Sequence, residues 1–190
     1  KAFQFQSGLE IVRSAFRASI ATMTEANERA KQAHMDYAMS GEDDSEYEDG
    51  ALVRSTLHEL SYAELEASIA VRVVREAFIM SAFHYWERSA RGWTGLHGKR
   101  QNFPDLRDAV SKQYTLHPRL EHLNTLNNLL KHNSQEKAEQ LFIDWPEVFR
   151  PPFQSATQKA GLIPILSISD YHVEEAFEAV SASGPQYETP

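Results

Sequence analysis

Two groups of polar side chains have types and spacing that could do chemistry, and the first lies in the run 126–133. Asn127, Asn128, Lys131 and His132 interrupt a leucine pattern that is typical of a helix facing a core. Asparagine lowers helix propensity because its side chain competes for backbone hydrogen bonds. Two asparagines in succession therefore indicate a buried polar network or a functional site. His132 is then either a candidate proton carrier or a residue that caps the helix end.

The second group lies in the most apolar stretch of the chain. His84, Glu87, Arg88 and Arg91 recur at positions i, i+3, i+4 and i+7, which places them on one face of a helix. A charged face on an otherwise apolar helix either meets solvent, with an intrahelical ion pair, or lines a cleft. The opposite face is expected to be apolar and to consist of Phe83, Tyr85 and Trp86.

Charge is distributed unevenly along the chain, whose 190 residues carry a formal net charge of -8. Much of the acidic excess lies in the segment 40–50, whereas the segment 84–132 holds eight Lys and Arg residues against four Asp and Glu residues. A locally basic segment can hold phosphates even in an acidic protein. The candidates for such phosphate contacts, which would be RNA contacts if the ligand is RNA, are Arg88, Arg91, Lys99, Arg100 and Arg119. The overall charge of -8 argues against nucleic acid, and an ordinary solvated surface has the same composition.

Several classes of chemistry have no support in the sequence. The chain has no cysteine, no paired histidines at metal-binding spacing, no phosphate-binding loop and no GxGxxG motif, so we expect neither a metal nor a cofactor. No apolar run approaches the roughly 18 residues of a membrane span, and no secretory signal is visible. These features predict a cytoplasmic protein with no membrane association.

Hydrophobic periodicity predicts an all-α fold, an up-down helical bundle with long central helices. A capping box at Ser7–Glu10 is expected to begin the first helix, and Ser169 or Asp170 to cap the last. We expect a single domain over 1–190, an acidic flexible loop at 40–50, a frayed tail at 184–190 and no paired strands. The helices are predicted at 9–39, 51–93, 105–114, 118–133, 134–143 and 170–182.

The spacing of Leu126, Asn128 and His132 matches the pattern Leu-Arg-Asn-x-x-x-His, and Phe83–Glu87 is similar to an aromatic stretch with a glutamate on an earlier helix. Over roughly Ile69–Ile143 the chain thus resembles the HEPN family (higher eukaryotes and prokaryotes nucleotide-binding). This resemblance implies a helical bundle that usually dimerises. It also implies a metal-independent ribonuclease of a bacterial toxin–antitoxin or phage-defence system, with His132, Asn128, Lys131 and Glu87 in the site.

The chain departs from the family pattern at the motif arginine, whose position is occupied by Asn127. In the family this arginine is taken to bind the scissile phosphate, while the histidine handles the proton of the attacking 2′-hydroxyl. An amide supplies no full positive charge, and losing such a contact costs on the order of 10²-fold in rate. Either Lys131 or Arg88 replaces the arginine in space, or the protein is a catalytically weakened relative that binds RNA or a partner.

A different class of function is compatible with the same residues. The polar helix can be a specificity network in a non-enzymatic helical interaction module, such as a regulatory subunit or an antitoxin-like partner. The two hypotheses differ in their dependence on salt, because an electrostatic RNA complex weakens steeply as the salt concentration rises.

Overall fold

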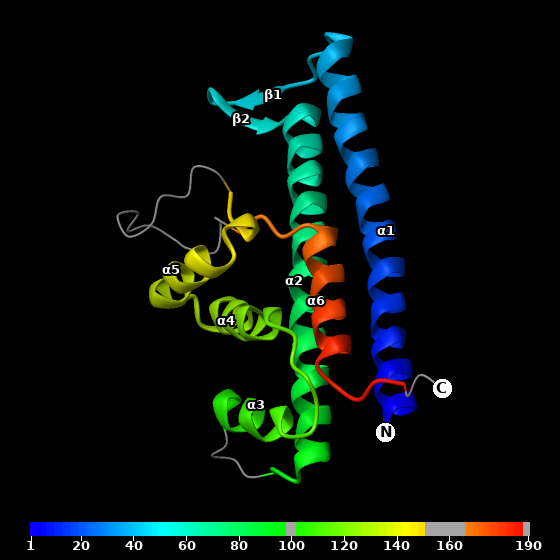
Figure 1. Cartoon of the computed structure of the whole chain (residues 1–190). Coiled ribbons are helices and arrows are strands. Elements are labelled where there is room, and N and C mark those ends of the chain that lie inside the picture. The colour runs from blue at the N-terminus through cyan, green and yellow to red at the C-terminus, as the bar shows by residue number, and fades with distance from the viewer. Residues whose placement is uncertain (98–101, 151–165, 188–190) are drawn as a thin grey trace. The chain divides into compact units, whose positions relative to one another are not determined.

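The computed structural model describes residues 1–97, 102–150 and 166–187. It confirms the all-α fold: the chain is 76% helical, with six helices and one small two-stranded sheet in the described part. The elements are α1 (Ala2–Ser40), β1 (Glu46–Glu48), β2 (Ala51–Arg54), α2 (Thr56–Thr94), α3 (Phe103–Ser111), α4 (Arg119–His132), α5 (Gln135–Asp144), the 3₁₀ turn η1 (Pro146–Val148) and α6 (Asp170–Ala182) (Figure 1). None of the described helices is long and apolar enough to cross a membrane.

The chain divides into two compact units. The first unit comprises Lys1–Ala15 and Arg75–Pro190, and the second comprises Phe16–Val74, so that α1 and α2 each contribute to both. The units differ sharply in charge. The first has fourteen basic and fifteen acidic residues, whereas the second has five basic and twelve acidic residues, a net of -7.

The core of the first unit forms around the C-terminal half of α2. Trp86 is fully buried there, and its Nε1 donates a hydrogen bond to the carbonyl oxygen of Ser183 at 2.7 Å. The apolar face of α6 is buried, and α4 packs against α5 and α6. The buried core side chains of α4 and α6 are Leu120, Leu123, Leu126, Leu129, Val173, Ala176, Phe177 and Val180.

The beginning of α1 differs from the prediction of an irregular lead-in before a capping box at Ser7. The helix begins at Ala2, because Phe5 is buried and gains aromatic contacts. Its ring stacks on Tyr85 at 5.6 Å and meets Trp93 edge-on at 4.8 Å between ring centroids. Burial of a large aromatic side chain outweighs the local preference of a serine for a helix terminus.

The second unit has a small core. Of its large apolar side chains only Phe16, Ile20 and Val71 are buried. His34 on α1 joins Glu64 on α2, with 2.6 Å between Nδ1 and Oε2. Ten of the fifteen large hydrophobic residues that are exposed in the described chain belong to this unit. A surface this apolar is typical of a region that contacts a partner.

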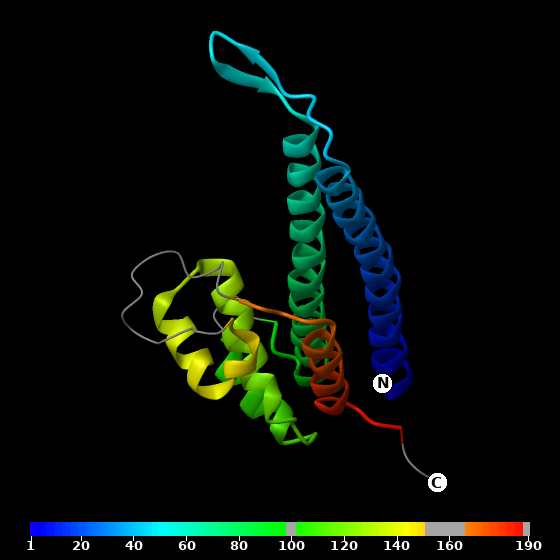
Figure 2. The same ribbon diagram turned by 90° about the horizontal axis from the view of Figure 1, so that it is seen from above.

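A β-ribbon joins α1 to α2, so the prediction of no paired strands was wrong. Glu46, Tyr47 and Glu48 pair antiparallel with Arg54, Leu52 and Ala51 respectively, with an irregularity between Glu46 and Tyr47. Asp49 and Gly50 both have positive φ, 49° and 80°, as a tight two-residue hairpin turn requires. Figure 2 shows the ribbon projecting past the ends of the two helices that it connects.

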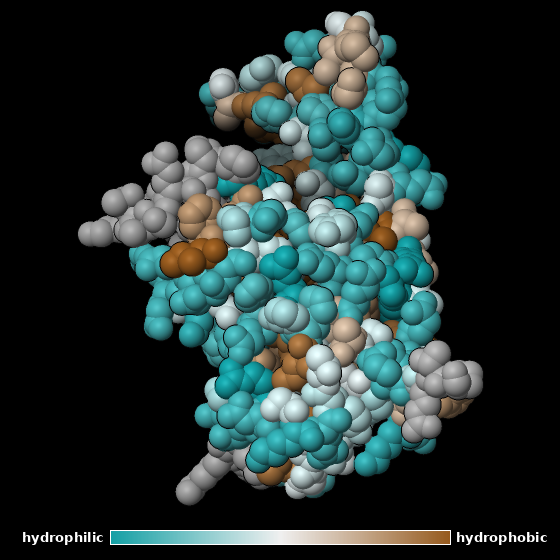
Figure 3. All heavy atoms as spheres, viewed as in Figure 1, coloured by the Kyte–Doolittle hydropathy of each residue, from teal (hydrophilic) through white to brown (hydrophobic). Residues whose placement is uncertain are grey.

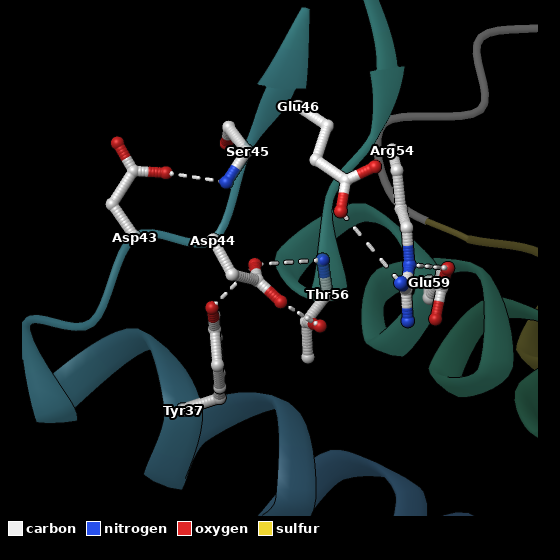
Figure 4. A network of polar contacts seen from close by, with 8 residues as sticks. All are labelled: Tyr37, Asp43, Asp44, Ser45, Glu46, Arg54, Thr56 and Glu59. Atoms are coloured by element: carbon white, nitrogen blue, oxygen red, sulfur yellow. Dashed lines mark hydrogen bonds and ion pairs between the residues drawn. The ribbon is translucent and has the colours of Figure 1, made fainter.

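Asp44 connects the end of α1 to the beginning of α2 (Figure 4). Its carboxylate accepts hydrogen bonds from the Tyr37 hydroxyl at 2.6 Å, from the Thr56 amide at 3.1 Å and from the Thr56 hydroxyl. These bonds hold the pKa of Asp44 down at about 2, chiefly through the Thr56 hydroxyl and then through Tyr37. Asp44 therefore caps the first turn of α2 from twelve residues upstream.

We predict that Asp44→Ala increases hydrogen exchange at the amides of Thr56 and the first turn of α2, because their acceptor is lost. Hydrogen exchange measured by NMR checks this. Since the pKa of Asp44 is lowered, the effect of the carboxylate is present above its ordinary pKa of 3.8 and is lost as the pH falls through about 2. Asp43→Ala is the control, because Asp43 accepts from the nearby Ser45 and not from α2. Equal exchange in both variants would contradict the assignment.

His172 in the first turn of α6 is buried, and Ser169 caps this helix as predicted. The Ser169 amide donates to Nδ1 of His172 at 3.1 Å, so this nitrogen acts as an acceptor in the neutral ring. Burial lowers the pKa of His172, which the acidic side chains of Glu175 and Glu147 partly oppose. Protonation of Nδ1 would remove the acceptor of this hydrogen bond.

We predict that lowering the pH reduces the free energy of unfolding through His172. A histidine whose folded pKa is lowered stabilises the fold fully above its ordinary pKa of 6.5 and loses this contribution as the pH falls below that value. Urea unfolding between about pH 8 and about pH 5 should show a smaller pH effect in His172→Gln than in the wild type. His58→Gln, at an exposed position, should keep the wild-type pH effect. An unchanged effect in His172→Gln would refute this role.

Candidate functional site

A polar cleft of about 620 Å³ lies along α2 in the first unit. His84, Glu87, Arg88 and Arg91 all line it, so the charged face predicted from their spacing borders a cleft. The remaining lining residues are Val12 on α1 and Ser81 and Tyr85 on α2. Phe83, Trp86 and Ala90 on α2 are buried, and their burial fixes the orientation of the helix.

Glu87 organises the charged side chains of this cleft. One carboxylate oxygen lies 3.0 Å from Nδ1 of His84, and the other lies 4.0 Å from Nη2 of Arg91. The cleft therefore holds two guanidinium groups, one carboxylate and the imidazole of His84. The Glu87 side chain is 24% exposed, so its interactions are less screened than those of a freely exposed pair.

Tyr85 forms one wall of the cleft and is fixed by α1. Its hydroxyl donates to the carbonyl oxygen of Phe5 at 3.0 Å, and Arg88 lies over its ring at 5.7 Å. A Cβ at Gly8 would overlap the Tyr85 hydroxyl, so the close approach depends on this glycine. Burial raises the pKa of Tyr85, and the charge of Arg88 opposes this. The predicted assignment of Tyr85 to the buried face was wrong, because its side chain is only half-buried and lines the cleft.

The predicted catalytic residues of α4 do not line this cleft. Asn127 is 2% exposed, and within the described residues its Oδ1 has no hydrogen-bond partner. Asn128 donates to Oδ1 of Asn124 at 3.3 Å. Lys131 and His132 are exposed in the last turn of α4, so His132 lies at the helix end as predicted. The structure therefore brings Glu87, Arg88 and Arg91 together and leaves the α4 group outside their cleft.

The other predicted RNA contacts have different surroundings. Arg119 is held by Glu175, with 2.8 Å between Nε and Oε1, and its guanidinium lies 4.5 Å from the centre of the Trp145 ring. Its Nη1 also lies 3.1 Å from Nδ1 of His122. Arg119 thus has a structural role between α4 and α6. Lys99 and Arg100 lie outside the described residues.

The chemistry available in the cleft is the recognition of an anion. Two arginines can donate several hydrogen bonds to phosphate oxygens, and a neutral imidazole can exchange a proton. Sequence reasoning identified the four charged residues but missed Ser81, Tyr85 and Val12 as parts of the site. In the described ranges no group of three or more histidine or acidic side chains is placed to hold a metal ion.

The predicted roles of the α4 residues depend on the resemblance to the HEPN family, which stays a prediction. The candidate site itself depends only on the positions of its side chains along α2 and α1. No protein-family model, no curated protein and no solved structure matches the chain.

Proposed function

We propose that this protein binds RNA through the cleft on α2 and is a catalytically weakened, HEPN-like RNA-binding relative of metal-independent ribonucleases. The observation that carries the proposal is the convergence of Arg88, Arg91 and His84 in one polar cleft beside the ring of Tyr85. Guanidinium groups suit phosphate, and an aromatic ring beside them suits a stacked base. We further propose that the protein is a cytoplasmic homodimer. It would act in a bacterial toxin–antitoxin or phage-defence system.

The charge distribution supports the placement of RNA on the first unit. This unit is close to neutral in total, whereas the second unit has a net charge of -7 and would repel a polyanion. Phosphates therefore meet less repulsion at the first unit, where the two arginines line the cleft.

The burial of Asn127 supports a weakened rather than a fully active enzyme. The family arginine would occupy this position, but the side chain here is buried and uncharged. His132, exposed in the last turn of α4, does not line the cleft that holds Arg88 and Arg91, so the arginines and this imidazole do not form one site. A ribonuclease of this class needs both charge stabilisation and proton transfer at the same phosphate.

We predict that Arg88→Ala/Arg91→Ala weakens binding of a short fluorescein-labelled oligouridylate by about tenfold or more at low salt, because two charge-assisted contacts are lost. Fluorescence anisotropy over a salt series measures the affinity. The slope of log K against log salt should become shallower by about 1.4, since each single-strand phosphate contact contributes about 0.7.

Arg29→Ala/Lys31→Ala is the matched control for this experiment. It removes the same charge from exposed positions on α1 in the second unit. The control should retain wild-type affinity and salt slope. Equal losses in the two double variants would indicate a general effect of net charge and would overturn the cleft as the binding site.

We predict that the wild-type protein binds the RNA but produces no 2′,3′-cyclic phosphate ends in the presence of EDTA, because the two arginines line the cleft on α2 and His132 does not. Denaturing electrophoresis and end analysis measure this. Cleavage that His132→Ala abolishes would reject the weakened form and establish an active α4 site. Cleavage that His84→Ala abolishes, with His132→Ala unaffected, would place the chemistry in the α2 cleft.

The alternative function, a non-enzymatic interaction module, is favoured by a separate observation. The exposed apolar side chains concentrate in the second unit, whereas the residues of the cleft belong to the first unit. This feature is compatible with RNA binding by the first unit, because the two surfaces consist of different residues.

A further inference from the structure

The β-ribbon of the second unit has open hydrogen-bonding edges. In the described chain, β1 and β2 pair only with each other, and all seven residues of the two strands are exposed. An isolated two-stranded ribbon is marginally stable in water, and an open strand edge is a template for pairing with another chain. The ribbon is therefore a surface on which a further strand would gain backbone hydrogen bonds.

The two faces of the ribbon have different chemistry. Tyr47 and Leu52 are paired across the strands and so share one face, where their side chains are 65% and 37% exposed. Glu48 follows Tyr47 along β1 and so points to the other face, which Glu46 shares with Arg54. One face thus offers apolar contact and the other offers negative charge along β1.

The negative charge extends around the ribbon. The segment that contains β1 and its turn also carries Glu42, Asp43 and Asp49, and Arg54 on β2 is the one basic residue between 42 and 54. In Figure 3, brown residues lie among teal residues over the ribbon. An apolar surface with an acidic surround is complementary to a basic partner with apolar side chains.

A second copy of this chain is a poor occupant of the β1 edge. An antiparallel pairing of β1 with itself about Tyr47 would place Glu46 opposite Glu48 in both directions. Like charges directly opposite each other destabilise a strand pair. The net charge of -7 on each copy of this unit adds to the repulsion.

We propose that the edge of β1 is a docking site for an extended segment of a partner protein in which apolar residues alternate with lysine or arginine. Such a segment adds a third strand, with an apolar side chain beside Tyr47 and basic side chains beside Glu46 and Glu48. The added strand satisfies the open edge and shields the exposed apolar face. This docking site is independent of the proposed RNA-binding cleft, because none of its residues lines that cleft.

Three fluorescein-labelled synthetic peptides test the proposal against the full chain by fluorescence anisotropy. The first alternates valine and lysine, the second has the same composition with the valines and lysines in separate blocks, and the third alternates valine and glutamate. The alternating basic peptide should bind at least about tenfold more tightly than the block peptide, because only the alternating order matches the two faces. Equal binding of the two basic peptides would mean non-specific attraction and would overturn the proposal.

Two substitutions on β1 locate the site. Glu48→Lys should weaken binding of the alternating basic peptide and strengthen binding of the alternating acidic one, whereas Glu28→Lys, the same charge change on α1, should leave the preference unchanged. Tyr47→Ser should weaken binding of the alternating basic peptide several-fold. Tyr62→Ser, at an exposed position on α2, should leave this binding unchanged. Circular dichroism must show the same helix content in all four variants.

Light scattering tests separately whether a second copy of this chain, rather than a different protein, occupies the β1 edge. A dimer of the wild type that Tyr47→Ser converts to a monomer would assign the β1 edge to self-association and overturn the proposal. The proposal would also be overturned if a folded Glu48→Lys variant still bound the alternating basic peptide more tightly than the alternating acidic one. RNA affinity should be equal in the wild type and Tyr47→Ser, so failure of this docking site can be distinguished from failure of the RNA-binding cleft.

Discussion

The burial of Trp86 is the interaction on which the first unit depends. Its indole donates to the carbonyl oxygen of Ser183, and the hydroxyl of Ser183 accepts from the amide of His117 at 2.9 Å and donates to Ala179 at 2.6 Å. One serine thus joins α2, the end of α6 and the approach to α4. Because this contact fixes the rotation of α2, it also determines that the helix presents His84, Arg88 and Arg91 to the cleft.

The division of charge between the two units suits the two kinds of recognition that we propose for different units of one short chain. A phosphate-binding cleft works best where the surrounding charge is near zero or positive, and the first unit meets this condition with a net of -1. The second unit combines a net of -7 with a small core and many exposed apolar side chains. These properties suit a basic protein partner and oppose a nucleic acid, so the two proposals use complementary electrostatics.

The helix boundaries were predicted well where the period of the apolar residues and the capping residues indicate the same ends. Those at 118–133, 134–143 and 170–182 differ from α4, α5 and α6 by one residue at most, since leucine spacing and Ser169 define them. The ribbon was missed because Asp49-Gly50, a strong hairpin turn, lies inside an acidic run that resembles a loop. The charged face at 84–91 was predictable from spacing, but its cleft was not, since Val12 and the support from Gly8 come from α1.

The internal balance of the cleft determines what kind of ligand it suits. Glu87 contacts both His84 and Arg91, so the charged face is ordered before any ligand arrives, and part of its positive charge is already neutralised. A single small anion therefore gains little over water, because it competes with a fixed carboxylate. A polyanion gains more, since its successive phosphates release counterions along an extended path while only one of them must approach Glu87. Recognition of a chain of phosphates, rather than of one, is what this arrangement favours.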